Sequence, residues 1–257
     1  MRKLGLDIFE GIELEQRLRL TAEAGFDSFF IDWGFAHDLQ EMTRQVTLGR
    51  SLGLTCDCSH TTIPGSELLW ADHPDVERVM ENFFLCMDNA AALEIPTVVI
   101  HCSPEYEPDF PLGIRRMERL AEYAEGKNLR IALENTAGGD WLVDTLRHFE
   151  GCGTVGFCYD SGHEAFCTPG YRFLPKIGHR LIYTHLHDNL IFSDHHLLPW
   201  DGKIGFDRVV GELRDCGYGG GLTLELNYTP YVDKLSPEDY VKRCFDLACC
   251  LSEQLDR

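Results

Sequence analysis

Residues 130–160 read RIALENTAGGDWLVDTLRHFEGCGTVGFCYD, and this stretch decides the fold. The short apolar runs at its two ends are typical of strands, and the segment Asp140–Glu150 between them has a helical pattern. Gly151 follows that segment, and a glycine just past a helix end supplies the left-handed conformation that terminates a helix. The stretch therefore predicts a strand–helix–strand unit in which the two strands end on carboxylates, at Glu134 and Asp160.

The same unit recurs about every 30 residues along the chain. Strand-like runs lie near residues 3–8, 28–32, 54–58, 97–102, 130–135, 155–160, 181–187 and 221–227. Helical patterns lie at Glu13–Ala24, Asp38–Leu52, Pro74–Leu93, Leu112–Glu125, Asp140–Glu150, Phe206–Cys216 and Pro237–Leu255. Glycines that could end these helices are Gly25, Gly53, Gly126, Gly151 and Gly217. The helix between the sixth and seventh strands is the least clear. We predict an α/β fold, a (β/α)8 TIM barrel that occupies residues 1–257 as a single domain.

A doubly wound open sheet is the alternative to the barrel. That fold would place a glycine-rich phosphate loop after the first strand, and none is found there. Residues 151–156 do match GxGxxG, but they follow a helix and precede a strand. This is the reverse of the order that a dinucleotide-binding fold requires.

Seven strand-like runs end on a side chain that can bind a metal: Asp7, His60, His101, Glu134, Asp160, His187 and Glu225. Core strands favour aliphatic and aromatic residues, so ionisable groups at one end of so many strands need an explanation. In a parallel barrel those ends meet at one mouth. We therefore predict a metal site in which Glu134, Asp160, His187 and Glu225 are the ligands. Three carboxylates and one imidazole suit Mn²⁺, Mg²⁺, Co²⁺ or Zn²⁺.

Further candidates for metal or substrate binding surround these four residues: His60, His101, His163, Asp194 and His196. His163 follows Asp160 by three positions. His185 precedes His187 by two positions, so the two side chains point the same way if both lie in a strand. Taken singly, each extra histidine is better explained as an exposed residue or as a neighbour of the ligands.

The composition excludes some partners. The chain has 23 basic and 42 acidic residues and a formal net charge of -19, which disfavours nucleic acid as the main partner. Its 11 cysteines form no CxxC pair. We interpret them, Cys158 included, as reduced and mostly buried thiols of a cytoplasmic protein. No signal peptide is evident, and no apolar run approaches the roughly 20 residues needed to span a bilayer.

The order of the motifs resembles one family along essentially the whole chain. These motifs are Ala132-Leu-Glu134-Asn135, Asp160-Ser-Gly-His163, His185-Leu-His187-Asp188-Asn189, the segment 194–206 and Leu224-Glu225. They resemble the xylose isomerase-like barrel superfamily. It holds the sugar phosphate isomerase/epimerase group, with ketose 3-epimerases, hydroxypyruvate isomerases and inosose dehydratases, and also endonuclease IV. No single motif is specific to one substrate.

The resemblance implies that Glu134, Asp160, His187 and Glu225 share one divalent metal, and that the two glutamates also move protons. In endonuclease IV the same site is the middle of a three-zinc cluster. The further ligands of that cluster correspond by motif to His60 and His101 on one side, and to His163, Asp194 and His196 on the other. This chain offers all of these residues, but many members of the superfamily that are not nucleases carry such histidines too.

The expected activity is that of a sugar isomerase or epimerase. The metal would chelate the substrate oxygens, Glu134 and Glu225 would act as acid and base, and His163 would hold or polarise substrate oxygens. The predicted loops hold aromatic residues whose rings suit the faces of a sugar or polyol: Trp33, Phe35, Trp70, Tyr106, Phe110, Phe166, Tyr171, Phe173, Trp200, Tyr228 and Tyr231. Of these, Trp33 and Trp200 are the residues predicted to bind the substrate. The same loops hold few cations, at Arg172, Lys176, Lys203 and Lys234, which favours a substrate without phosphate.

Three other functions remain open on the sequence. A keto-polyol dehydratase would use similar proton abstraction. The chain offers the ligands of a trinuclear zinc phosphodiester hydrolase of the endonuclease IV kind, but its excess of acidic residues opposes a DNA substrate. A non-catalytic barrel would not need Glu134 and Glu225. A homo-oligomer is compatible with the exposed helix faces, and a membrane partner is not expected.

Overall fold

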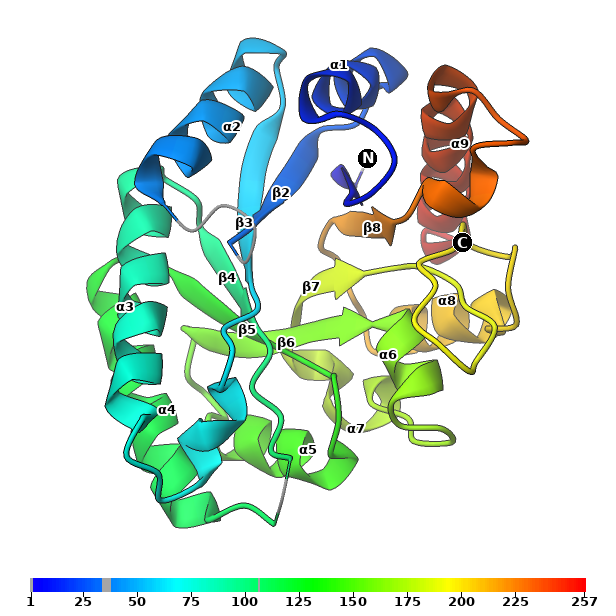
Figure 1. Cartoon of the computed structure of the whole chain (residues 1–257). Helices are drawn as coiled ribbons and strands as arrows, with labels where there is room; N and C mark the ends of the chain where they lie inside the picture. The colour runs from blue at the N-terminus through cyan, green and yellow to red at the C-terminus, as the bar shows by residue number, and fades with distance from the viewer. Residues whose placement is uncertain (1, 34–37, 106) are drawn as a thin grey trace.

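The computed structural model describes residues 2–33, 38–105 and 107–257. Eight strands form one sheet, and helices surround it on the outside (Figure 1). The strands are β1 Leu4–Ile8, β2 Ser28–Asp32, β3 Thr55–Thr61, β4 Thr97–Ile100, β5 Arg130–Glu134, β6 Val155–Asp160, β7 Leu181–His185 and β8 Leu222–Leu226. The helices are α1 Leu14–Ala24, α2 Leu39–Ser51, α3 Val76–Ala92, α4 Phe110–Gly126, α5 Gly139–His148, α6 Ser161–Phe166, α7 Leu174–Ile177, α8 Phe206–Asp215 and α9 Pro237–Leu255. Three 3-10 turns are η1 Ser66–Trp70, η2 Gly178–Arg180 and η3 Thr229–Tyr231.

The sheet is parallel and nearly closed. The strand order is β7-β6-β5-β4-β3-β2-β1-β8, and the paired neighbours are all parallel. The two end strands meet just beyond β7, where the Leu186 N–H donates to the Thr223 carbonyl oxygen at 2.9 Å. Leu186 also forms a parallel bridge with Leu224. The predicted (β/α)8 barrel is therefore confirmed, and the open doubly wound sheet is excluded because β1 pairs with β8.

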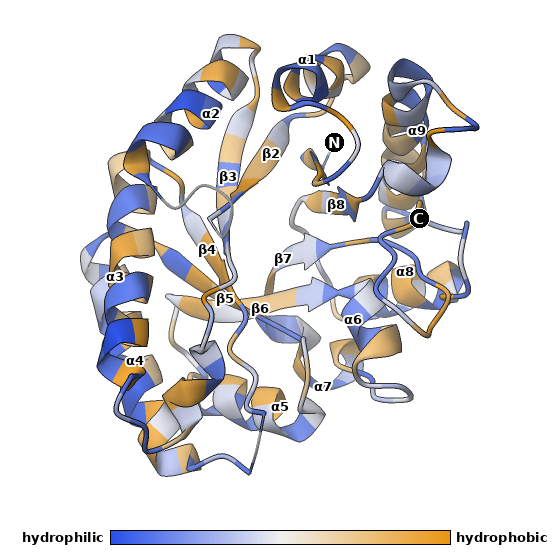
Figure 2. Cartoon of the chain, in the orientation of Figure 1, coloured by the Kyte–Doolittle hydropathy of each residue, from blue (hydrophilic) through white to orange (hydrophobic). Residues whose placement is uncertain are grey.

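Hydrophobic packing has two layers, one outside and one inside the barrel. The larger core lies between strands and helices, and Figure 2 shows hydrophobic residues along the strands with hydrophilic residues mixed into the outer helices. A smaller cluster fills the barrel interior with Phe30, Cys58, Val99, Ala132, Cys158 and Tyr183. This inner layer forms the floor on which the polar residues at the carboxyl ends of the strands lie.

The helices and strands end close to the positions predicted from the sequence, with two differences. Four of the predicted glycines have a positive φ, as a left-handed helix end requires, but Gly126 lies inside α4 and Asn128 adopts a φ of 57° instead. The unclear region between β6 and β7 contains two short helices, α6 and α7, followed by η2. Among the residues placed in the structure, no helix combines the length and apolar character needed to cross a bilayer.

Replacement of Gly113 by alanine should destabilise the fold. A Cβ atom at this position in α4 would overlap the indole ring of Trp70. Trp70 is buried, stacks on Phe110 and donates its Nε1–H to the Cys102 carbonyl oxygen at 2.6 Å. We expect a loss of about 1–3 kcal/mol in the free energy of unfolding, measured by urea denaturation.

Gly126→Ala, in the same helix, is the matched control because nothing lies within 4 Å of its added Cβ. Equal stability of the Gly113 and Gly126 variants would show that Trp70 can move aside without cost.

Candidate metal centre

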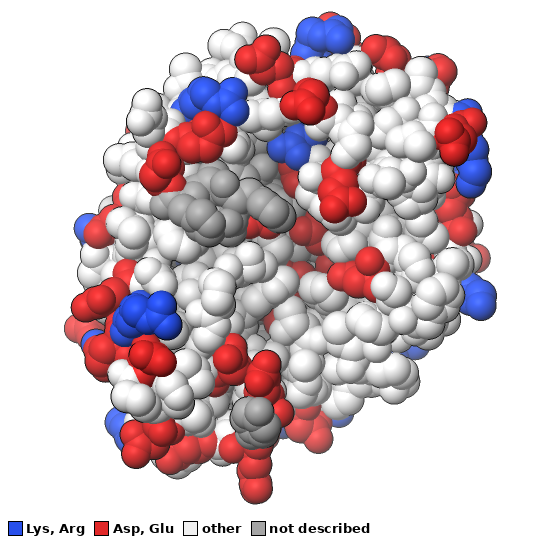
Figure 3. Space-filling view, in the orientation of Figure 1, with Lys and Arg blue, Asp and Glu red and all other residues white. Residues whose placement is uncertain are grey.

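The carboxyl ends of the strands bring the predicted ligands together at one mouth of the barrel. Acidic side chains gather in and around a central hollow on this face (Figure 3). Glu134, Asp160, His187 and Glu225 are all buried, with exposed fractions of 5% or less. Asp7, on β1 beside Glu225, is buried too and forms an ion pair with Arg17 at 3.6 Å.

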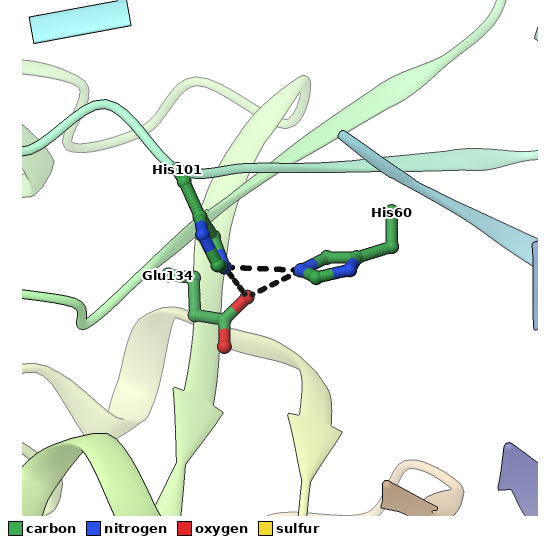
Figure 4. Close-up of side chains that lie close together, drawn as sticks. All are labelled: His60, His101 and Glu134. Carbon is green, nitrogen blue, oxygen red and sulfur yellow. Dashed lines mark hydrogen bonds and ion pairs between the residues drawn. The ribbon is translucent and has the colours of Figure 1, made fainter. Parts of the chain in front are cut away.

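Glu134 is the centre of this group, because both of its carboxylate oxygens contact histidines. Oε2 lies 2.9 Å from His101 Nε2 and 3.3 Å from His60 Nε2 (Figure 4). Oε1 lies 3.2 Å from His163 Nδ1 and 3.2 Å from His185 Nδ1. The four imidazoles come from β3, the residue after β4, α6 and β7, so one carboxylate ties four units of the barrel together.

One group of four candidate ligands contains His185 in place of His187. Ligand atoms of Glu134, Asp160, His185 and Glu225 all lie within 4.8 Å of one another. His187, the imidazole predicted from the sequence as a metal ligand, points to the same side of the barrel as His185. Its Nε2 lies 3.1 Å from Asp160 Oδ2, and it belongs to a second group with His196 and Glu225. Both rings are fully buried, and His187 lies two residues beyond the end of β7.

The remaining candidate ligands flank this centre on two sides. His60 and His101 form a group with Glu134, and their Nε2 atoms are 3.0 Å apart. On the other side, Asp194 Oδ2 lies 3.2 Å from His163 Nε2 and 3.0 Å from His196 Nε2. The rings of His187 and His196 stack with centroids 3.9 Å apart.

Buried side chains outside the ligand set hold the ligands in place. Asn135 pairs with the backbone of Asp160 through two hydrogen bonds of 2.8 Å. Asp160 also caps α6, because its Oδ1 accepts from the His163 N–H at 2.6 Å. Asp188 accepts three backbone N–H groups, from Asn189, Gly202 and Ile204, at 2.8–2.9 Å. It thereby shapes the loop that carries Asp194 and His196.

Asp32 also belongs to this group of residues, although it was not predicted from the sequence. Asp32 ends β2, and its Oδ2 lies 3.6 Å from His60 Nδ1, on the far side of the ring from Glu134. A carboxylate in this position orients an imidazole whose other nitrogen faces a metal site. The pattern that identified the other residues, a carboxylate at the end of an apolar run, is also present in SFFID32.

The predicted aromatic residues have different environments. Trp33 follows β2 and is buried, with 5% of its surface exposed. Trp200 is 36% exposed, and its ring lies 5.3 Å from that of Phe206. Phe35 and Tyr106 lie outside the described residues.

Charge in the centre is balanced among carboxylates and imidazoles. Burial alone would raise the pKa of Glu134, but the charges of His185 and His101, with hydrogen bonds from His101 and His163, hold it well below its usual range. Burial opposes the charged form of His60 and His163, yet the neighbouring carboxylates raise the pKa of both rings well above the usual value. For His101 the effect of burial outweighs the attraction of Glu134, and the pKa of this ring is lowered.

These observations fit a divalent cation. Within the described ranges, the ion pairs of Glu134, Asp160, Asp194 and Glu225 are made with histidines, and no Lys or Arg contacts them. Three carboxylates and an imidazole in contact form a donor set that hard and borderline divalent ions prefer.

Comparison with known proteins identifies the family. The family model described as xylose isomerase-like TIM barrel matches residues 18–246, so the chain belongs to this family and the resemblance seen in the sequence is confirmed. The uncharacterised protein y4fM of Sinorhizobium fredii is 33% identical over 188 residues, which cover 66% of this chain and 58% of y4fM. The chain thus spans less than two thirds of the length of that relative.

Two further similarities involve proteins with a named activity. Inosose isomerase of Halalkalibacterium halodurans is 24% identical over 193 residues, and the match covers 68% of each chain. The crystal structure of D-psicose 3-epimerase with D-tagatose, from Clostridium cellulolyticum H10, superposes with a TM-score of 0.76 over 99% of both chains at 13% identity. At this identity the structural match shows the common fold alone.

Raising the pH of the metal-free protein should remove the stabilisation that His187 contributes. Burial would lower the pKa of His187, but Asp160 outweighs it and raises the pKa from 6.5 to about 9. The contribution is therefore complete below the unfolded value of 6.5 and is lost as the pH rises through about 9. It amounts to about 3 kcal/mol at most.

The measurement is urea denaturation in the presence of a chelator at roughly pH 6 and pH 9.5. Wild type should lose more stability across this interval than His187→Gln. An equal loss in both proteins would contradict the role of the His187–Asp160 pair.

Proposed function

We propose that the protein is a divalent-metal-dependent isomerase or epimerase that acts on a sugar or polyol derivative by proton abstraction next to a carbonyl. The observation that carries this proposal is the shared buried group of Glu134 and Glu225 with Asp160 and His185. Two carboxylates from separate strands, β5 and β8, reach the same small volume. A reaction that removes a proton from a carbon and returns one needs such a pair.

Glu134, Asp160 and Glu225 would hold the ion, together with the imidazole of His185. His187, the ligand predicted from the sequence, would then orient Asp160 through its 3.1 Å contact. A bound divalent ion would polarise the carbonyl oxygen of the substrate as a Lewis acid and favour the enediolate.

The residues of the chain divide the proton transfers between two carboxylates. Glu134, whose low pKa keeps it ionised, accepts a proton from the carbon next to the carbonyl. Glu225, on β8, exchanges a proton with the other face of the substrate. His163, whose Nδ1 lies 3.2 Å from Glu134 Oε1, would hold substrate oxygens.

The surroundings of the site favour a neutral substrate. Of the four cations predicted in the loops, Arg172 forms an ion pair with Glu212, and Lys176 lies 5.0 Å from the centre of the Tyr171 ring. Lys234 lies 5.7 Å from the Tyr231 ring. These contacts engage three of the four side chains that could otherwise bind a phosphate. Inosose isomerase and D-psicose 3-epimerase, which the chain resembles, are named for substrates of the polyol and sugar classes.

A second candidate is a trinuclear phosphodiester hydrolase. The observation in its favour is the pair of flanking groups, His60 with His101 and His163 with Asp194 and His196. The acidic hollow opposes it, because a nucleic-acid backbone must be held by cations. A keto-polyol dehydratase would share the proton abstraction and differ in its product, which a substrate panel distinguishes.

Glu134→Gln and Glu225→Gln should each lower turnover by at least about 100-fold, because glutamine cannot accept or return the proton. Turnover is measured by chromatography of a panel of ketoses and inososes. Glu118→Gln is the control, since this exposed residue on α4 contacts His148 away from the mouth. Near-wild-type turnover in either active-site variant, with the fold intact, would contradict the acid–base assignment.

His185→Ala should reduce Mn²⁺ affinity more than His187→Ala does. His185 Nδ1 faces both Glu134 and Glu225, at 3.2 Å and 3.7 Å, whereas His187 contacts Asp160 and Asp194. Calorimetric titration of the two variants gives the comparison. The reverse order of affinities would restore His187 as the ligand.

A further inference from the structure

We propose that the protein binds a small amino acid or a similar zwitterion in a second site, at the amino-terminal mouth of the barrel. The inner layer separates this mouth from the metal centre, and the site does not depend on the proposed function. A cavity of about 260 Å³ opens there. The polar residues that line it lie at or near the beginnings of the strands: Lys3, Ser28, Asp57, Thr97, Arg130 and Thr223.

The walls of this cavity are unusual for the interior of a barrel. Bulky branched side chains normally fill the interior of a parallel barrel. Here the hydroxyl groups of three buried residues line the cavity instead, and Ser28, Thr97 and Thr223 are 4% exposed or less. Buried polar groups need hydrogen-bond partners, so a polar cavity of this kind holds water or a ligand.

Two irregularities in strand pairing shape the cavity. Asp57 is skipped where β2 pairs with β3, because the register shifts between Phe29 and Phe30. Ile182 is skipped in the same way where β6 pairs with β7. Both skipped residues line the cavity. Such bulges redirect a side chain and are frequent next to functional sites, so the carboxylate of Asp57 is the group that the local geometry singles out.

Asp57 brings a negative charge to the cavity without a cation in contact. Its Oδ1 accepts from the Tyr183 hydroxyl at 2.8 Å. Within the residues that the structure describes, no Lys or Arg forms an ion pair with it. Burial raises the pKa of this carboxyl from 3.8, although hydrogen bonds from Ser28 and Tyr183 and the charge of Lys3 oppose the rise. An ammonium group beside the carboxylate would stabilise its charged form.

Lys3 and Arg130 supply positive charge at the rim of the same cavity. Both residues are exposed. Arg130 Nη2 donates to Thr97 Oγ1 at 3.3 Å, and neither cation forms an ion pair in the described part of the chain. The two side chains are therefore available to bind a carboxylate.

The three charges together select the ligand. A simple anion would leave Asp57 without a cation, and a simple cation would leave Lys3 and Arg130 without an anion. A molecule with an ammonium group and a carboxylate complements all three charges. The cavity is smaller than the roughly 300–1,000 Å³ of pockets that bind drug-sized ligands, so the ligand is small. The buried hydroxyl groups suit a polar side chain such as that of serine.

The test uses L-serine, titrated by calorimetry into the full chain after chelator treatment, so that no metal ion holds the ligand. We expect saturable binding of one serine per chain. Glycerate lacks the ammonium group and ethanolamine lacks the carboxylate. Each should bind at least roughly ten-fold more weakly than serine, because each leaves a charge of the site without a partner.

Variants of the charged residues locate the site. Asp57→Asn and Arg130→Gln should each weaken serine binding at least about ten-fold. Lys3→Gln repeats the test at an exposed residue whose replacement leaves the interior unchanged, and circular dichroism reports the fold of each variant. Lys242→Gln is the matched control, because this exposed residue on α9 pairs with Asp246 at 2.7 Å and does not line the cavity.

The outcomes separate this site from the metal centre. Absence of serine binding, equal binding of glycerate, or unchanged binding in folded Asp57→Asn would overturn the zwitterion site and leave the proposed reaction in place. Serine binding that requires added Mn²⁺ would place the ligand at the metal centre and would also overturn the inference. Serine binding that persists in a protein without isomerase activity would support the second site and count against the proposed reaction alone.

Discussion

Four imidazole nitrogens contact the buried carboxylate of Glu134, two at each oxygen, and the rest of the site depends on this interaction. Removing a carboxylate from water is costly unless charges or hydrogen bonds compensate. Here the compensation comes from residues of four βα units, so it is available only when the barrel is closed. The same arrangement leaves the oxygens of Glu134, Asp160 and Glu225 facing one another, which a cation stabilises better than protons do.

Much of this arrangement could be predicted from the sequence, because parallel strands bring their carboxyl ends to one mouth. Glu134, Asp160 and Glu225 needed only the strand pattern. The strand pattern does not decide whether His185 or His187 is the metal ligand. β7 ends at His185, and Asp188 starts an antiparallel bridge with Leu197, a tertiary contact that periodicity does not encode. That bridge and the hydrogen bonds to Asp188 fix the backbone directly after His187.

Other parts of the site could not be found from local pattern alone. Asp32 carried the same pattern as its neighbours, but its role depends on the orientation of the His60 ring. Cys158 looks in the sequence like any apolar residue of a buried strand. In the structure its Sγ lies 3.8 Å from His185 Nδ1, a contact that the strand pattern does not reveal. The family is shown by its sequence model, while the nature of the substrate rests on an acidic, cation-poor mouth.

We propose that these buried carboxylates and imidazoles form a metal centre. Elemental analysis of the full chain, purified without chelator, tests this proposal. We expect one divalent ion per chain, removed by a chelator and restored by adding Zn²⁺, Co²⁺ or Mn²⁺. Three zinc ions per chain would favour the hydrolase instead of the isomerase. A protein that contains no metal and takes up none on addition would show that these residues do not form a metal centre.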